Sequence, residues 1–210
     1  MKSLRISLST FGAIAALALA LPANATPVSA LTFTGFSTNG TAINSTRGYA
    51  FNVTVSGLSA TALSFWDDDG LGLSQAHDIG LWDPAGNLIA SATVPSGTAA
   101  TLIAGFRVVD IPDVLLPIGS GYTVGAVFLA GSADLQAINL TGISTPAGIT
   151  FVEGRFINNG LATLTRPTTS FNGIPGGSLL VDSVSSVPEP ASLSLLAFGA
   201  GLLALKRVRG

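Results

Sequence analysis

The feature of this sequence that most constrains its fold is a series of short apolar runs, each bounded by turn-forming residues. Between positions 49 and 55, bulky apolar residues alternate with small or polar ones. Successive side chains of a β-strand point to opposite faces, so this alternation predicts a strand with one buried face. The residues expected on that face are Tyr49, Phe51, Val53 and Val55. The other runs expected to form strands are 31–36, 62–66, 79–82, 88–93, 102–111, 122–129, 149–156 and 178–184.

Turn chemistry separates these runs. In 83–87 (Asp-Pro-Ala-Gly-Asn), proline favours a turn position and glycine tolerates a positive φ angle. The stretches 95–97 and 117–121 mark turns in the same way. Many short strands at hairpin spacing, without a long helical period between the two chain ends, predict an all-β fold. We expect an antiparallel β-sandwich of jelly-roll-like type at residues 26–183, with irregular loops at 131–146 and 166–177.

The N-terminal segment has the pattern of a secretory signal. Lys2 and Arg5 precede an uncharged alanine- and leucine-rich core at 6–21, and Ala23 and Ala25 supply the small-x-small site of signal peptidase. The pattern predicts a signal peptide at residues 1–25. A stop-transfer anchor is the alternative, in which case the small-residue site is coincidental.

The C-terminal segment combines a proline-rich linker, an apolar stretch and a basic end. A linker is expected at 184–190, followed by fifteen uncharged residues at 191–205. As a helix these would rise about 22 Å, which is short of a hydrocarbon core of about 30 Å. The basic residues Lys206, Arg207 and Arg209 would resist translocation and keep the end of the chain in the cytoplasm. We expect transient membrane insertion of residues 191–210.

The order of these parts resembles the PEP-CTERM sorting signal of exported proteins in Gram-negative bacteria that make exopolysaccharide. The matching residues are Val187, Pro188, Glu189 and Pro190, then the apolar stretch, then Lys206, Arg207 and Arg209. In that family a membrane protease, exosortase, recognises Pro-Glu-Pro and removes the apolar helix and basic end. The resemblance implies processing by signal peptidase and exosortase, and delivery to the outer membrane, cell surface or extracellular matrix. A permanent tail anchor is the alternative.

Composition between the two ends excludes several classes of function. Residues 26–186 carry ten acidic side chains and four arginines, for a net charge of −6. Such a balance argues against nucleic-acid binding and against adhesion to anionic lipid. The chain has no cysteine, which excludes disulfides, thiol nucleophiles and thiolate metal sites.

A second resemblance concerns the centre of the chain, roughly residues 39–127. A strand and a Gly- and Asp-rich loop at 65–73 precede the run His-Asp-Ile-Gly-Leu-Trp at 77–82 and the return strand Asn-Leu-Ile-Ala at 87–90. This pattern is similar to the DUF4082-type sandwich, which accompanies carbohydrate-related and surface proteins. The resemblance implies a fold and no assigned activity.

The acidic loop offers a possible calcium site. Asp67, Asp68, Asp69 and Asp78 supply hard oxygen ligands of the kind that calcium prefers. Three of them are consecutive, whereas an EF-hand loop requires acids at alternate positions. The alternative is a solvated turn, because aspartate hydrogen-bonds its own backbone there.

The single histidine and the large aromatic residues are the remaining candidates. His77 alone excludes sites that need two histidines, and we expect it to be a strand-entry residue bonded to a loop rather than a general base. Trp66, Trp82 and Tyr122 are possible rings for stacking on a sugar. Alternatively, both tryptophans pack under loops.

These observations predict an exported structural protein of the cell surface or matrix, without catalysis and without a required cofactor. A carbohydrate-binding module is the first alternative, with exopolysaccharide as its possible partner. A polysaccharide hydrolase is the second, because ten acids could place two carboxylates at the required separation by chance. No Gly-x-Ser-x-Gly motif is present, and residues 26–186 contain no lysine.

Overall fold

Thirteen β-strands and no helix occur in the part of the chain that the computed structural model describes, residues 26–40, 43–173 and 176–182. None of these residues therefore belongs to a helix long and apolar enough to cross a membrane. The expected signal peptide, the linker and the apolar segment at 191–210 lie outside the described residues.

The strands form two main sheets and a two-stranded ribbon, and every pairing is antiparallel. The six-stranded sheet has the order β12 (Thr169–Phe171), β11 (Ile149–Ile157), β3 (Ser45–Val53), β9 (Gly119–Phe128), β5 (His77–Trp82), β6 (Leu88–Val94). The five-stranded sheet has the order β1 (Val28–Ser29), β13 (Gly177–Asp182), β4 (Leu58–Trp66), β8 (Phe106–Leu116), β7 (Thr101–Ile103). The ribbon pairs β10 (Gln136–Thr141) with β2 (Gly35–Asn39).

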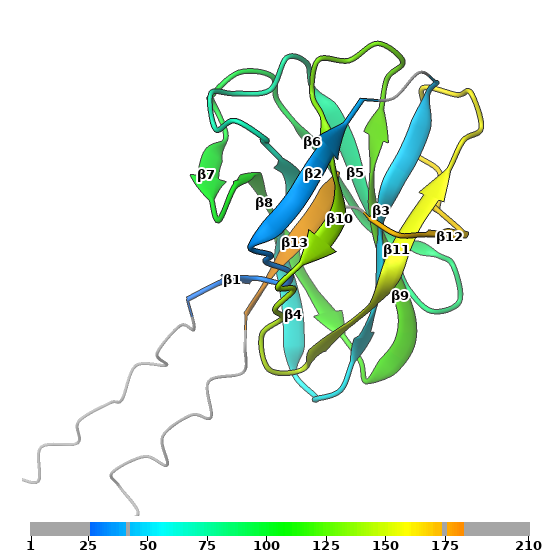
Figure 1. The fold of residues 1–210 in the computed structure, drawn as a ribbon. Helices are drawn as coiled ribbons and strands as arrows, with labels where there is room; N and C mark the ends of the chain where they lie inside the picture. The colour runs from blue at the N-terminus through cyan, green and yellow to red at the C-terminus, as the bar shows by residue number, and fades with distance from the viewer. Residues whose placement is uncertain (1–25, 41–42, 174–175, 183–210) are drawn as a thin grey trace, which may run out of the picture. The chain divides into compact units, whose positions relative to one another are not determined.

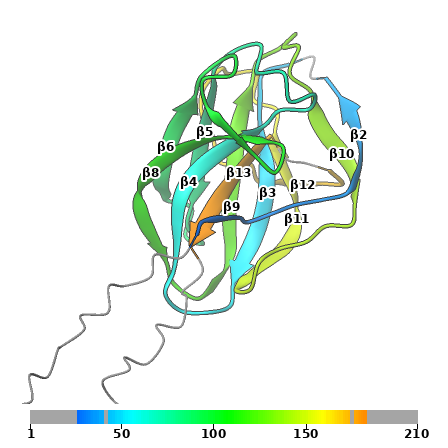
Figure 2. The same cartoon turned by 90° about the vertical axis from the view of Figure 1, so that its left-hand side faces the viewer.

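The two main sheets pack face to face, as Figures 1 and 2 show from two directions. The chain changes sheet between β3 and β4, β4 and β5, β6 and β7, β8 and β9, and β12 and β13. In Figure 1 the ribbon of β2 and β10 crosses the side of the sandwich that faces the viewer. The structure confirms the all-β antiparallel sandwich, and its repeated crossings between sheets give the jelly-roll-like character.

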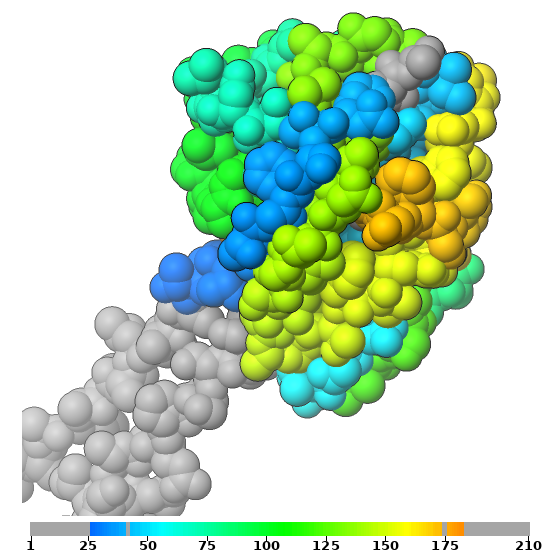
Figure 3. Space-filling view, viewed as in Figure 1, coloured from blue at the N-terminus to red at the C-terminus, as the bar shows by residue number. Residues whose placement is uncertain are grey.

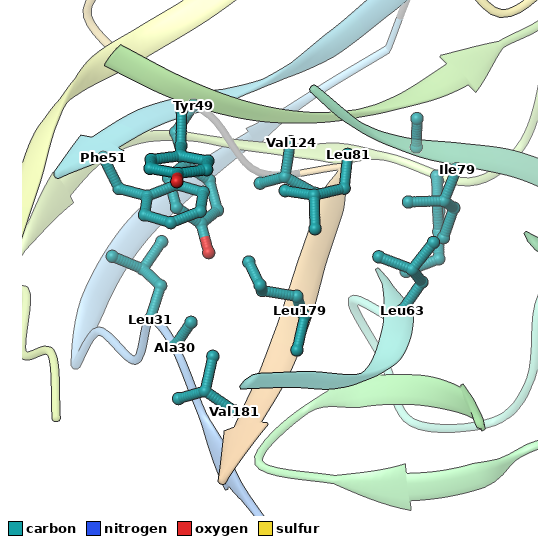
Figure 4. Packing of buried hydrophobic residues seen from close by; sticks show 14 of the residues in the cluster. Ala30, Leu31, Tyr49, Phe51, Leu63, Ile79, Leu81, Val124, Leu179 and Val181 are labelled. Carbon is teal, nitrogen blue, oxygen red and sulfur yellow. The ribbon is translucent and has the colours of Figure 1, made fainter. Parts of the chain in front are cut away.

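The main core lies between the inner faces of the two sheets, as Figure 4 shows. The six-stranded sheet contributes Tyr49, Phe51, Ile79, Leu81 and Val124, and the opposite layer contributes Ala30, Leu31, Leu63, Leu179 and Val181. Each large apolar side chain buried here stabilises the fold by about 1.5–3 kcal/mol relative to leaving it exposed. The alternation read from the sequence therefore corresponds to the buried face of β3, through Val53.

The turn between β5 and β6 has the predicted chemistry. The Asp83 carboxylate accepts the Asn87 backbone N–H at 2.9 Å and the Asn87 side-chain amide at 2.9 Å. The Gly86 N–H donates to the Asp83 carbonyl, and Gly86 has a φ of 92°, a conformation that a side chain would disfavour. The aspartate and the glycine together close this hairpin.

Some predicted boundaries are wrong. Val55 lies beyond the end of β3 and is 40% exposed, so it is not on the buried face. The run at 102–111 is two strands, because Ala104 and Gly105 both have positive φ angles and reverse the chain. The stretches 131–146 and 166–177, expected to be irregular, contain β10 and β12.

Candidate functional site

The residues of the sorting signals are not part of the structural description. Ala23, Ala25 and the segment from 187 to 209 lie outside the described residues. The candidate sites that the structure does describe are the acidic loop, the histidine, the aromatic residues and two surface cavities.

The acidic loop after β4 is built around a buried ion pair between Asp67 and Arg107. The Arg107 Nε donates to Asp67 Oδ2 at 2.7 Å, and both side chains are almost fully buried. The same carboxylate accepts the backbone N–H groups of Gly70 at 3.0 Å and Gly72 at 3.1 Å. The Arg107 guanidinium also donates to the Gly70 carbonyl at 2.8 Å and the Ala100 carbonyl at 3.2 Å. Asp67 and Arg107 are therefore a structural clamp on the loop.

The remaining acids of the predicted calcium site are arranged less favourably. Carboxylate oxygens of Asp67, Asp68 and Asp69 lie within 4.8 Å of one another, but Asp78 is not in this group. Asp78 accepts the Thr93 hydroxyl at 2.6 Å across the β5–β6 pair. Asp69 accepts the Leu71 N–H at 2.8 Å, as in an aspartate turn. Desolvation, with the charges of Asp69 and Asp67, raises the pKa of Asp68. A cation here would compete with Arg107 for Asp67.

His77 lies at the start of β5 and both its ring nitrogens are engaged. Nδ1 lies 2.8 Å from the Val127 carbonyl oxygen, and Nε2 lies 2.8 Å from Asp134 Oδ2. A carbonyl only accepts, so Nδ1 carries a proton, and a second proton must lie between Nε2 and the carboxylate. The imidazole is buried and stacks on Phe65, with ring centroids 3.6 Å apart. It is a strand-entry histidine bonded to a loop, as the sequence predicts.

Asp134, which sequence reasoning missed, is the centre of this cluster. Its carboxylate accepts the Ser74 N–H and the Ser74 hydroxyl, each at 2.7 Å, and the His77 ring at 2.8 Å. Desolvation raises the pKa of Asp134, but the hydrogen bonds from His77 and Ser74 outweigh it and the pKa is lowered overall. Ser74 donates to Asp134 rather than to His77, so the three residues are not arranged as a nucleophile and its base. The cluster joins the 67–76 loop to the loop after β9.

The three rings proposed as a sugar-stacking platform are buried in three separate places, so that prediction is wrong. Trp66 belongs to the five-stranded sheet and is 8% exposed. It packs against Phe33, Phe36 and Phe106, with centroid distances of 4.7, 5.3 and 5.3 Å. A flat polar-rimmed platform needs exposed ring faces, and these are covered.

Trp82 and Tyr122 belong to the six-stranded sheet and face opposite ways. Trp82 is 5% exposed, and its ring lies beside the position that a Cβ on Gly80 would occupy, next to Leu164. Tyr122 stacks on Phe51 in the core with centroids 5.5 Å apart, and its hydroxyl donates to the Pro117 carbonyl at 2.8 Å. Burial raises the pKa of Tyr122, with a smaller contribution from Asp83. The tryptophans pack under loops and neighbouring strands, which was the alternative interpretation.

Two cavities on the surface border strand β11. The larger, about 440 Å³, is a cleft between the end of β10, β11 and β12. In Figure 3 the orange spheres of β12 lie between the yellow-green of β10 and the yellow of β11. Its lining includes Phe151, Val152, Glu153, Ser170 and Phe171, with Val152 and Phe171 well exposed.

The smaller cavity, about 210 Å³, is lined by residues of β3, β9 and β11 in the same sheet. Thr123 and Arg155 extend into its lining from β9 and β11, and Arg166 closes it from the segment that precedes β12. Neither cavity was predicted from the sequence. In the smaller one, Arg155 and Arg166 are eleven positions apart in the sequence, and only the fold brings them to one cavity.

Comparison with known families adds the decisive observation about the end of the chain. The PEP-CTERM protein-sorting motif matches residues 186–209. The chain carries a PEP-CTERM sorting motif. No curated protein and no solved structure matches it.

This motif indicates export, processing by exosortase, and a location at the cell surface or outside the cell. The match lies outside the described residues. It therefore indicates how the protein is sorted and says nothing about the biochemical function of the β-sandwich. The resemblance of the central region to the DUF4082-type sandwich stays a prediction.

Proposed function

We propose that the mature protein is a structural component of the cell surface or the extracellular polysaccharide matrix, and that it performs no catalysis. The single observation that supports this best is the engagement of His77. Its imidazole is buried, Nδ1 donates to a backbone carbonyl, and Nε2 lies within hydrogen-bond distance of Asp134 Oδ2. A general base must reach the proton that it removes, and this histidine reaches only the interior.

The carboxylates offer little to a hydrolase. Asp67 is held by Arg107 and Asp134 by His77, both within the fold. Among the described residues, Glu153 is the one acid that lines the larger cleft, and it forms an ion pair with Arg155 at 2.5 Å. Glycoside hydrolysis requires two carboxylates on either side of the scissile bond. The cleft supplies one.

The route and destination are tested in a host that contains exosortase. The full chain is expressed beside a variant with Pro188→Ala and Pro190→Ala, and matched to a control with Ser186→Ala, which leaves Pro-Glu-Pro intact. Intact mass and fractionation then report processing and location. We expect the wild type and the control to lose residues 191–210 and reach the matrix fraction. Wild-type molecules absent from both surface and matrix fractions would contradict the proposal.

Absence of catalysis is tested on the purified mature protein. Polysaccharides from a producing host are incubated with it, and new reducing ends are measured over days against a heat-denatured sample. We expect no turnover. Product formation that disappears with Glu153→Gln would replace the structural role with a hydrolase.

The larger cleft favours carbohydrate binding as a second candidate function. Its volume lies in the range of about 300–1,000 Å³ typical of ligand sites. Phe171 is 39% exposed there, and Glu153, Ser170 and Asn172 line the same cleft with hydrogen-bonding groups. An apolar ring with polar groups at its rim matches the amphipathic surface of a sugar.

This candidate is tested by glycan binding to the mature protein with Phe171→Ala. Phe36→Ala is the matched control, since Phe36 is 44% exposed but does not line the cleft. We expect binding of a neutral exopolysaccharide fragment to weaken about tenfold in Phe171→Ala and to remain in Phe36→Ala. Equal binding by both variants would exclude the cleft.

A further inference from the structure

The smaller cavity gathers half of the positive charge between the two chain ends. Residues 26–186 contain four arginines, and two of them, Arg155 and Arg166, line the same cavity. The rest of this region carries ten acids, so its average potential is negative. The fold therefore creates a local positive site that the net charge of the domain does not reveal.

Arg155 is held in place by two contacts, and part of its guanidinium has no hydrogen-bond partner among the described residues. Its Nη1 donates to the Thr168 carbonyl at 2.6 Å, and its Nη2 pairs with Glu153 at 2.5 Å. Its Nε is buried and has no hydrogen-bond partner among the described residues. Guanidinium groups carry five N–H donors, so these contacts leave part of the fork unused.

Arg166, which lines the same cavity, has fewer hydrogen-bond partners. Its Nη2 donates to the Gly121 carbonyl at 3.2 Å, the one hydrogen bond that its side chain makes within the described residues. An added Cβ at position 86 would lie 2.7 Å from Nη1, so the end of the arginine side chain would have to shift. Gly86 therefore lies directly against this guanidinium, and its positive φ also forms the turn.

The charges around the cavity are not fully compensated. Glu153 pairs with Arg155, but among the described residues Arg166 forms no ion pair. Asp83, in the neighbouring turn, uses its carboxylate on Asn87. Two guanidinium groups with one carboxylate leave a net positive charge beside the hydroxyl-bearing side chains of Thr123 and Thr168, which also line the cavity.

We propose that this cavity binds an oxyanion, the carboxylate, sulfate or phosphate group of an acidic ligand. Such a group accepts the in-plane donors that guanidinium presents, and it offsets the repulsion between two arginines. The volume of about 210 Å³ suits one charged group or one acidic sugar residue rather than a chain of them. On an extracellular protein the group comes from a free anion or from an acidic residue of a polysaccharide. The inference rests on the proposed matrix role only for that second source.

The experiment measures binding to the mature protein by calorimetry and by NMR titration at low salt. The probes are sodium sulfate, inorganic phosphate, oligogalacturonate, and a neutral galactose oligomer of the same length. Arg155→Gln and Arg166→Gln remove the donors. Thr168→Glu places a carboxylate at the exposed rim while keeping the backbone carbonyl that Arg155 uses. Ser96→Asp is the matched control, because it changes the net charge by the same −1 at an exposed turn that does not line the cavity.

We expect acidic probes to bind and the neutral oligomer not to bind, with affinity weakened about tenfold or more by each arginine variant and by Thr168→Glu. Affinity should fall as salt rises, and Ser96→Asp should retain it. Tighter binding of oligogalacturonate than of the inorganic anions identifies the acidic polysaccharide as the source, and the reverse identifies a free anion.

No binding of any acidic probe, or equal loss in Ser96→Asp, would overturn the anion site. If an arginine variant fails to fold, Thr168→Glu decides the question alone, since its side chain is exposed. The proposed matrix role is tested independently, because it is measured by fractionation and not by anion affinity.

Discussion

Arg107 and Arg166 have the same chemistry and opposite surroundings. Arg107 is 5% exposed, pairs with Asp67, and donates to two backbone carbonyls as well. Arg166 makes one long hydrogen bond at the edge of a cavity. The first guanidinium receives its partners from the protein, whereas the second retains donors for a ligand. Exposure and partner count, rather than residue type, separate a structural arginine from a binding one.

The largest test of this contrast is removal of one member of the buried pair. Arg107→Gln leaves Asp67 as an uncompensated buried charge, which typically costs about 3–5 kcal/mol of unfolding free energy. Arg166→Gln should cost about 1 kcal/mol or less, as for exposed polar contacts. Urea unfolding of both variants measures the difference. Similar losses would show that both arginines are structural and would weaken the case for the cavity.

The second test concerns the other buried polar cluster. Asp134→Ala removes the acceptor of the buried His77 ring, and a buried group left unsatisfied costs about 1–3 kcal/mol. Ser74 loses the same acceptor, but it is exposed and can bond to water. Asp78→Ala is the matched control, since that carboxylate is exposed and accepts one hydroxyl. Chemical denaturation should place Asp134→Ala well below the control in stability. Equal midpoints would mean that the cluster contributes little.

The same cluster predicts the acid limb of the stability profile. The pKa of Asp134 is lower in the folded protein than in the unfolded chain, so its contribution is complete above the unfolded value of about 3.9. It is lost as the pH falls through the lowered folded value. The raised pKa of Asp68 acts in the opposite sense, because protonation relieves a carboxylate that folding disfavours.

Melting between pH 2 and 6 separates the two carboxylates. In Asp134→Asn the drop in melting temperature below pH 4 should be shallower than in the wild type. In Asp68→Asn it should be steeper, because the offsetting group is gone. Parallel profiles for the three proteins would contradict this assignment.

The difference between buried and exposed polar groups also explains what the sequence could predict. The apolar alternation in β3 and the Asp83–Asn87 turn depend on residues that are neighbours in the chain. Both can therefore be predicted from the sequence. Asp134 contacts His77 across fifty-seven positions, and Arg155 and Arg166 line one cavity although they belong to different segments, β11 and the stretch before β12. Neither arrangement leaves a pattern among neighbouring residues of the sequence. The residues that cover the two tryptophans, such as Phe33 over Trp66 and Leu164 beside Trp82, come from distant parts of the chain.

The missed hairpin at Ala104 and Gly105 provides a smaller test. Both residues have positive φ, 51° and 84°, which two-residue hairpin turns of this kind require. Sequence signals for such turns are Asn-Gly or Asp-Gly, so Ala-Gly within an apolar run predicts a continuous strand. Gly105→Ala would place a Cβ 2.5 Å from the Trp66 ring and add backbone strain. We expect a loss of about 1–3 kcal/mol and a changed tryptophan emission. Ala104→Gly, which relieves strain, is the control and should be neutral or stabilising.

The smallest expected effect is that of calcium on the acidic loop. Asp67 offers two oxygens to a cation only if it releases Arg107, Gly70 and Gly72, and Asp78 faces Thr93 instead. We therefore expect millimolar calcium to shift the melting temperature by about 1 °C or less, with Asp69→Ala unchanged beside the wild type. A ligand that binds only the folded state at a hundred times its Kd would stabilise by about 2.7 kcal/mol, which is readily detected. Such a shift, abolished by Asp68→Ala, would show that the loop opens its ion pair to take a metal. Asp67 would then belong with Arg166 among the groups that bind ligands rather than with Arg107.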